Sequence, residues 1–351
     1  MTRAEILFDP VAHRYTDTLG RVYTSVTTLL GWYSGKDFNT KYWGMFKALE
    51  VRPSVQKVKA HDDEKHYTVF YYSHTTGKVE ELVLTLDELL CKPEFEQIRT
   101  VYYEILNTWK SKAKEATDAG HEEHNYLEDC IDDLYRGKDQ LQIGDIAINR
   151  DFKYKVTTIQ ELDVSPFKST HPSIYLMLAD AIGAGYTLYA EKRLYSVDHL
   201  LCGTSDLVME RNGDCYIVDW KTNKDKLHFE SGYYKKVWNT DKTKKIKGEW
   251  VKSYKPTYMQ YPVSHIESSK GTGYQLQLSI YGRLCEYWGL NCLGLILVHI
   301  QRMVDENDEP ILDERQKQKY HTPVFYQLPI LRTEVDNILN HNFSLRVKQS
   351  K

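Results

Sequence analysis

The pair Asn212-Gly213 lies between two runs of alternating apolar residues and constrains the fold more than any other feature. Asn-Gly in this setting is the strongest short-range signal for a two-residue β-hairpin turn. If these two residues form the loop, the residue numbers of every facing pair on the two strands add up to the same total. Asp206 then lies directly opposite Asp219. The sequence therefore predicts a hairpin that sets two carboxylates face to face, provided that no β-bulge shifts either strand.

Two opposed carboxylates carry an electrostatic cost. Like charges directly opposite on one sheet face are destabilising, and burial among apolar neighbours adds a desolvation penalty. A cation bound between Asp206 and Asp219 removes this cost, and the main-chain carbonyl of Trp220 is a further candidate ligand. Lys221 projects on the same face as Asp219, and Gly203 permits close backbone approach. Two acids and a lysine on one face outline a metal-dependent phosphodiester-cleaving site.

Composition excludes several other classes of protein. The chain has 351 residues and a net charge of −3, so any nucleic-acid contact must come from local patches. The six cysteines contain no CxxC pair, which argues against a zinc ribbon and favours a reduced intracellular compartment. We find no signal peptide, membrane-spanning run or P-loop motif. These features predict a cytoplasmic protein, in the host cytoplasm if the protein is viral.

The order of predicted elements favours a mixed sheet flanked by helices. A long helical stretch opens at Pro93 and is expected to break at Gly120. We expect an N-terminal helical and hairpin elaboration over 1–110, with an inserted β-hairpin at about 51–98, and a core over 111–351 with a lysine-rich insertion at about 223–272. The core elements are predicted as helix 172–181, strands 186–196, 200–210 and 215–221, helix 273–287 and strand 292–300.

Three further positions are candidates for the same site. Glu191, on the preceding strand, is either another ligand or an acid that supports the ligands, or an exposed residue paired with a neighbouring base. His124 shares a helix face with a glutamate four residues later and is a candidate ligand, with His121 as its competitor. Gln277 and Tyr281 are also spaced i, i+4, and could hold a phosphate or the lysine, or could simply face the core and solvent.

A lysine-rich stretch is the candidate nucleic-acid contact. Basic residues interleaved with aromatic ones suit phosphate neutralisation and base stacking, although charge runs are more often solvated surface. The candidate contacts are Lys235, Lys236, Lys244, Lys245 and Trp250.

Four short motifs, taken in order, resemble the RecB-type branch of the PD-(D/E)XK nuclease superfamily. Each motif is weak alone, but the ordered set is fairly specific and covers about residues 115–300. The motifs are Gly120-x-x-x-His124, Gly203-x-x-Asp206, Asp219-x-Lys221 and Gln277-x-x-x-Tyr281.

The resemblance implies a restriction-endonuclease-like αβββαβ core and a DNase that depends on Mg²⁺ or Mn²⁺. It implies that His124, Asp206 and Asp219 are metal ligands and that Lys221 is catalytic. It also implies that Gln277 and Tyr281 support these residues.

The segment Tyr23–Leu30 also resembles the opening of phage-type and mitochondrial single-strand DNA exonucleases, which makes Ser25 and Thr27 candidate DNA contacts. We therefore expect an exonuclease acting on single strands or strand ends in DNA repair or recombination, with a replication or recombination protein as partner. The open alternatives are a structure- or site-specific endonuclease with the same site and an inactive DNA-binding homologue. The 51–98 insertion and the lysine-rich segment depart from the family pattern.

Overall fold

The chain divides into two units, which are described separately. The computed structural model describes residues 6–9, 14–35, 39–52, 54–61, 63–132, 154–156, 167–223, 226–237, 249–253, 256–306, 309–314 and 319–349. The larger unit comprises Met1–Gly35 and Gly120–Lys351, and the smaller unit comprises Lys36–Ala119. Residues 1–35 therefore belong with the C-terminal part of the chain, because strand β3 pairs in parallel with strand β9.

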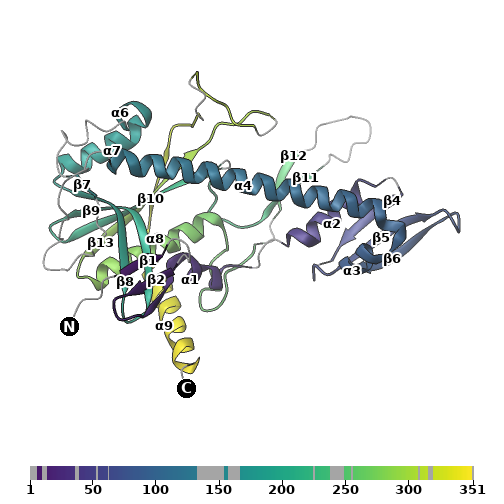
Figure 1. The fold of residues 1–351 in the computed structure, drawn as a ribbon, viewed down its shortest axis with the longest axis horizontal. Helices are drawn as coiled ribbons and strands as arrows, with labels where there is room; N and C mark the ends of the chain where they lie inside the picture. The colour runs from purple at the N-terminus through teal and green to yellow at the C-terminus, as the bar shows by residue number, and fades with distance from the viewer. Residues whose placement is uncertain are drawn as a thin grey trace. The chain divides into compact units, whose positions relative to one another are not determined.

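Within the described residues, nine strands form one mixed sheet in the larger unit (Figure 1). The pairs β3–β9 and β10–β13 are parallel and the other pairs are antiparallel. The main path runs β1(Ile6–Asp9), β2(Arg14–Asp17), β3(Val22–Ser25), β9(Leu201–Arg211), β10(Asp214–Asn223), β13(Asn291–Gln301) and β14(Val324–Leu328), while β8(Thr187–Ser196) pairs with β9 and β7(Tyr154–Val156) pairs with β8.

The predicted hairpin is confirmed. Strands β9 and β10 are joined at Asn212 and Gly213, which have φ angles of 53° and 88°. Positive φ at both positions is what a type I′ turn requires, and it matches the twist of the flanking strands. The ladder runs from the pair Arg211–Asp214 to the pair Leu207–Val218. The residue numbers of each pair add up to the same total, as the position of the turn dictates.

Helices cover both faces of this sheet. Consecutive residues of a strand point to opposite faces, so neighbouring residues of β10 belong to different core clusters. Ile217 belongs to a core cluster with α1(Val26–Tyr33), α8(Lys270–Tyr287) and α9(Arg332–Gln349), whereas Val218 belongs to a cluster with α7(Pro172–Gly183) and the end of α4(Glu96–Asp132). The predicted order of helix, three strands, helix and strand is confirmed by α7, β8, β9, β10, α8 and β13. The larger unit also contains the short helix α6(Phe167–Thr170) and the pair β11(Tyr233–Val237) and β12(Glu249–Ser253).

The predicted break at Gly120 is wrong, because α4 continues through it. A single glycine inside a helix costs only about 1 kcal/mol relative to alanine, so one glycine does not end a helix. A Cβ at Gly120 would lie 3.1 Å from Oγ1 of Thr222. This glycine therefore marks a close approach of α4 to the end of β10.

The smaller unit is an antiparallel sheet with its own core. Its strands run in the order β4–β5–β6, and Gly77, at φ 67°, lies in the turn between β5 and β6. Tyr42 stacks on Tyr67 at 4.4 Å between ring centroids, and both are buried with Phe95. Its elements are α2(Thr40–Glu50), β4(Val55–Ala60), β5(His66–Ser73), β6(Lys78–Thr85), α3(Leu86–Cys91), a 3₁₀ turn Pro93–Phe95 and the start of α4.

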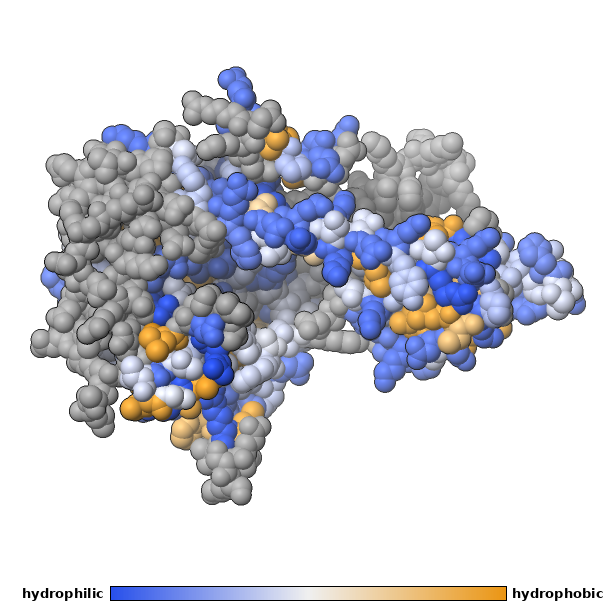
Figure 2. Space-filling model, viewed as in Figure 1, coloured by the Kyte–Doolittle hydropathy of each residue, from blue (hydrophilic) through white to orange (hydrophobic). Residues whose placement is uncertain are grey.

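Most of the coloured side chains on the visible surface are hydrophilic. Figure 2 shows hydrophobic side chains there only in separate patches among polar ones. In the described ranges, no helix is both long and apolar enough to cross a bilayer.

Candidate active site

Asp206 ends the hydrogen-bonded ladder between β9 and β10. The ladder stops at Leu207 and Val218, one step before Asp206 would face Asp219. At that step Oδ2 of Asp206 accepts a hydrogen bond of 2.7 Å from the main-chain N–H of Trp220. The carboxylate thus takes the place that a main-chain carbonyl would fill in a continuing ladder. Asp206 is thereby held beside Asp219 and the segment that follows it.

The strand on the other side of β9 is irregular at the same level. Strand β8 pairs Ala190 with Leu207 and Lys192 with Ser205, which places Glu191 opposite Asp206 without a ladder pair. Glu191 has a φ of 47°, a value that is uncommon for a residue other than glycine. The backbone is thus distorted on both sides of the carboxylate at Asp206.

The side chain of Glu191 is partly buried, and its surroundings include Tyr15. Burial raises the pKa of Tyr15, and the negative charge of Glu191 adds to that effect. The role of Glu191 as a ligand, or as an acid that supports the ligands, stays a prediction.

Asp219 and Lys221 form a close pair on the face of β10 that α8 covers. Asp219 is fully buried, and Nζ of Lys221 lies 2.5 Å from its Oδ2. Burial lowers the pKa of Lys221, but the charges of Asp219 and Asp206 outweigh this and raise it overall. The lysine is therefore a permanent cation at neutral pH.

Tyr274, on α8, completes the surroundings of the lysine. The centroid of its ring lies 5.3 Å from Nζ of Lys221, within the range of a cation–π contact. Sequence reasoning missed this residue, although it precedes Gln277 by three positions and so lies on the same helix face.

The two motif residues of α8 contact each other and the motif glycine of β9. Nε2 of Gln277 donates a 3.0 Å hydrogen bond to the hydroxyl of Tyr281, which is buried. A Cβ at Gly203 would lie only 2.7 Å from Cε1 of Tyr281. Burial raises the pKa of Tyr281, and the charge of Asp219 raises it further. The tyrosine is therefore a neutral phenol beside the acidic pair.

The donor set fits a hard divalent cation. Mg²⁺ in proteins is held by one or two carboxylates, with water and substrate phosphate as the other ligands. Asp206 and Asp219 provide two buried carboxylates on adjacent strands, with the ammonium of Lys221 against them. No group of three His, Cys, Asp or Glu side chains suited to a metal ion is found in the described part of the chain. The side chain of His124 lies outside that part, and the carbonyl of Trp220 stays a candidate.

The C-terminal part of α4, which carries His124, is tied to the start of α7 by a buried contact between a carboxylate and an imidazole. Oε1 of Glu123 lies 2.9 Å from Nε2 of His171, the residue that precedes α7, and both side chains are less than 10% exposed. His121, the competing histidine, is exposed. No sequence signal singles out Glu123 or His171, because they are far apart along the chain and share no periodic pattern.

The candidate DNA contacts of the lysine-rich stretch lie only partly within the described residues. Lys235 and Lys236 lie in β11, where Lys236 pairs with Trp250 of β12, but their side chains fall outside the described set. Lys244 and Lys245 lie entirely outside the described residues.

Ser25 and Thr27 lie at the start of α1. Oγ of Ser25 caps the helix by accepting the N–H of Thr28 at 3.0 Å and lies 3.0 Å from Oγ1 of Thr27. Ser25 also pairs with Cys202 across β3 and β9, directly before Gly203. Both hydroxyls are therefore on a segment that adjoins the motif strand.

Comparison of the chain with protein-family models, with curated proteins and with solved structures gives no match.

Proposed function

We propose that the chain is a metal-dependent deoxyribonuclease of the RecB-type PD-(D/E)XK branch. One observation carries this proposal: residues of three separate motifs lie together around two buried carboxylates. Asp206 bonds to the main chain that follows Asp219, Lys221 pairs with Asp219, and Tyr281 contacts Gly203. A structural role for this arrangement would be costly, because buried like charges need compensation.

The order α7, β8, β9, β10, α8 and β13 supports a restriction-endonuclease-like core, since it reproduces the αβββαβ order of that fold. The parallel pairing of β10 with β13 is consistent with a helical crossover through α8.

Asp206 and Asp219 would hold Mg²⁺ or Mn²⁺, with His124 and the carbonyl of Trp220 as further candidate ligands. Such an ion, when bound, supplies an activated water and neutralises phosphate charge. Lys221 would orient the attacking water and stabilise the negative charge that develops on the phosphate. Its pairing with Asp219 keeps the ammonium in place before substrate binds.

Tyr281 and Gln277 would support these groups rather than react. The phenol of Tyr281 stays protonated, because burial and the charge of Asp219 raise its pKa. It can therefore donate a hydrogen bond towards the acidic pair, and the amide of Gln277 fixes the position of its oxygen. Glu191 would act as an additional acid on the neighbouring strand.

The proposed substrate is DNA, as a single strand or at a strand end, in repair or recombination and alongside a replication or recombination protein. End-labelled single- and double-stranded DNA, linear and circular, should be incubated with Mg²⁺ and with EDTA. The native protein is expected to degrade linear DNA in Mg²⁺ only. Cleavage of circular DNA would identify an endonuclease with the same site.

Matched variants test the site itself. Asp219→Asn and Lys221→Met keep the side-chain size and remove charge, and each is expected to reduce cleavage about 10²- to 10³-fold. Lys270→Ala, at an exposed lysine that begins α8, is the control and is expected to cleave like the native protein. Undiminished cleavage by both site variants would reject the assignment, and no cleavage by the native protein would favour the DNA-binding homologue.

Metal binding is a separate readout. Asp206→Asn retains an oxygen for the N–H of Trp220 but removes a charge. We expect Mn²⁺ binding, measured by calorimetry, to weaken sharply in this variant, and unchanged binding would remove Asp206 from the ligand set.

A further inference from the structure

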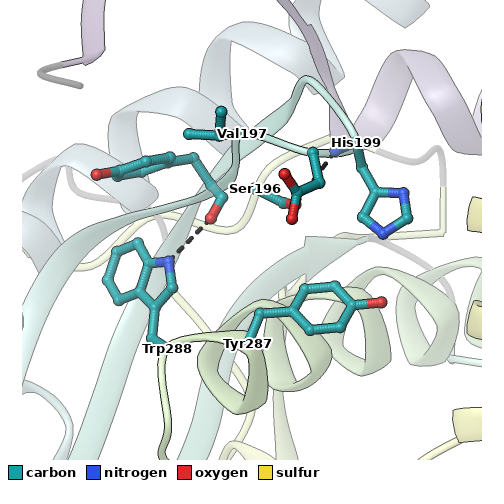
Figure 3. A pocket seen from close by; sticks show the side chains of 7 residues that line it. Ser196, Val197, His199, Tyr287 and Trp288 are labelled. Atoms are coloured by element: carbon teal, nitrogen blue, oxygen red, sulfur yellow. Dashed lines mark hydrogen bonds between the residues drawn. The ribbon is translucent and has the colours of Figure 1, made fainter. Parts of the chain in front are cut away.

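A cavity of about 280 Å³ lies apart from the two carboxylates, between the turn that joins β8 to β9 and the end of α8 (Figure 3). It is lined by residues 195–199 and by Tyr287 and Trp288. Sites for drug-sized ligands occupy about 300–1,000 Å³, so this cavity suits a single small ring system.

The walls of the cavity are aromatic and held in place. The indole N–H of Trp288 donates a 2.9 Å hydrogen bond to the carbonyl of Tyr195, drawn as the dashed line from Trp288 in Figure 3. The rings of His199 and Tyr287 stack with centroids 5.5 Å apart, and Tyr287 is 43% exposed. Fixed aromatic rings at a partly open cavity offer contact area for a flat guest without a large ordering cost.

The cavity also offers a polar group for the edge of a guest. Nδ1 of His199 is buried and has no hydrogen-bond partner among the described residues. A buried polar atom without a partner is costly, and a ligand with a complementary edge would remove that cost. Burial lowers the pKa of His199, so its ring is neutral at pH 7 and can donate or accept.

The charges around the cavity are of both signs, because the carboxylate of Asp198 is part of its lining. The guanidinium of Arg283 already lies 5.0 Å from the centroid of Tyr287, and Nζ of Lys192 lies 5.4 Å from that of Trp288. Arg283 is itself paired with Glu286 and Asp336, so neither sign of charge dominates at these rings. The walls therefore favour a neutral ring with hydrogen-bonding atoms at its edge.

The cavity is close to the candidate active site along two elements. At about 3.3 Å per residue, the five residues from Asp206 back to Leu201 at the turn span about 17 Å. At about 1.5 Å per residue, the six residues of α8 from Tyr281 to Tyr287 span about 9 Å. These spans correspond to a few nucleotides along a DNA strand.

We infer that this cavity binds one nucleobase of a DNA strand whose backbone is held at the active site. The inference rests on the proposed function, because it takes DNA as the substrate. It adds a base-stacking subsite outside the reacting groups. This subsite would fix the register of the strand and would accept any flat ring with hydrogen-bonding atoms at its edge.

Binding without cleavage tests this subsite. The full chain, with Ca²⁺ in place of Mg²⁺, is titrated into a fluorescein-labelled single strand of about 15 nucleotides, and anisotropy gives the dissociation constant. Tyr287→Leu and His199→Ala are expected to weaken binding about 5- to 150-fold, the range measured for loss of one base–aromatic stack. Tyr287→Phe keeps the ring and is expected to bind like the native protein.

A strand with one abasic position, moved along its length, separates stacking from general charge attraction. The native protein is expected to lose affinity at one abasic position, and Tyr287→Leu is expected to show no further loss there. Native affinity in both Tyr287→Leu and His199→Ala, with unchanged melting temperatures, would overturn the subsite. Equal losses of affinity in Tyr287→Leu and Tyr287→Phe would also overturn it. So would a dependence on Tyr287 that is seen for the binding of an arginine-rich peptide but not for the binding of DNA. Failure of the proposed function would show instead as absent cleavage by the native protein in Mg²⁺.

Discussion

Replacing Gly203 by alanine tests the contact that joins β9 to α8 at the candidate site. A Cβ at this position would lie 2.7 Å from Cε1 of Tyr281 and 3.0 Å from Cγ2 of Val26. Ordinary contacts begin at 3.4 Å, so the ring of Tyr281 would have to retreat by about 0.7 Å. Tyr281 and Val26 are 2% and 1% exposed, so neither can move into solvent.

The expected cost of Gly203→Ala follows from this crowding. Extra atoms in a well-packed core cost about 1–3 kcal/mol, so we expect the free energy of unfolding to fall by that amount. Native domains are stable by about 5–15 kcal/mol, so the variant remains folded at 25 °C. Displacement of the Tyr281 hydroxyl, which Gln277 holds at 3.0 Å, is expected to lower kcat/KM about 10- to 100-fold.

The control for this experiment lies in the same helix. A Cβ added at Gly273, in the first turns of α8, would meet no atom within 4 Å, so Gly273→Ala is expected to be neutral or stabilising by about 0.5–1 kcal/mol. Urea unfolding gives the stabilities, and Mg²⁺-dependent cleavage gives the activities. If Gly203→Ala keeps native stability and activity, the docking of Tyr281 on β9 is wrong. If only stability falls, Tyr281 supports the core and not the reaction.

Three other changes have defined outcomes. Glu123→Ala or His171→Ala leaves a buried polar partner without its contact and is expected to cost about 1–3 kcal/mol in urea unfolding. Glu123→Leu combined with His171→Phe should recover part of that loss, and additive effects would contradict the pairing. Burial raises the pKa of Asp17, but hydrogen bonds within the β2–β3 hairpin outweigh this and lower it, so Asp17→Asn is expected to cost about 1–3 kcal/mol at pH 7. The difference in stability between the native protein and Asp17→Asn should persist above the ordinary pKa of about 3.9 and vanish as the pH falls through the lowered pKa of Asp17. Thermal melts that show the same difference at every pH would refute this prediction. Tyr274→Leu is expected to lower kcat/KM about 2- to 30-fold through loss of its contact with Lys221, and an equal loss in Tyr274→Phe would assign the effect to the hydroxyl.

The hairpin was predictable because its information is local. Asn212 and Gly213 accept the positive φ angles of a type I′ turn, and once the turn is fixed, the register of every following pair is fixed as well. The same reasoning placed Asp206 at the level of Asp219. It could not show that the ladder ends there, because the carboxylate of Asp206 competes with a main-chain carbonyl for the N–H of Trp220.

Contacts between distant elements were not predictable from spacing. The i, i+4 relation of Gln277 and Tyr281 predicts that they meet, but their packing on Gly203 depends on how α8 docks on the sheet. The same holds for Gly120, which looked like a helix break in the sequence and proves to be a point of close approach to Thr222. In both cases the sequence shows a glycine, and only the tertiary structure shows what occupies the space of its missing side chain.

The formal charges of the site explain why metal and substrate should bind together. Asp206, Asp219 and Glu191 contribute three formal negative charges and Lys221 contributes one positive charge, so the group carries two net negative charges. In that state it repels a phosphodiester, which is itself an anion. A divalent cation would cancel this net charge and place a positive centre beside the same phosphodiester. Strand binding at the carboxylates should therefore depend on the metal, whereas base stacking at Tyr287 should not, and the two contributions can be separated by titrating DNA with Ca²⁺ or with EDTA.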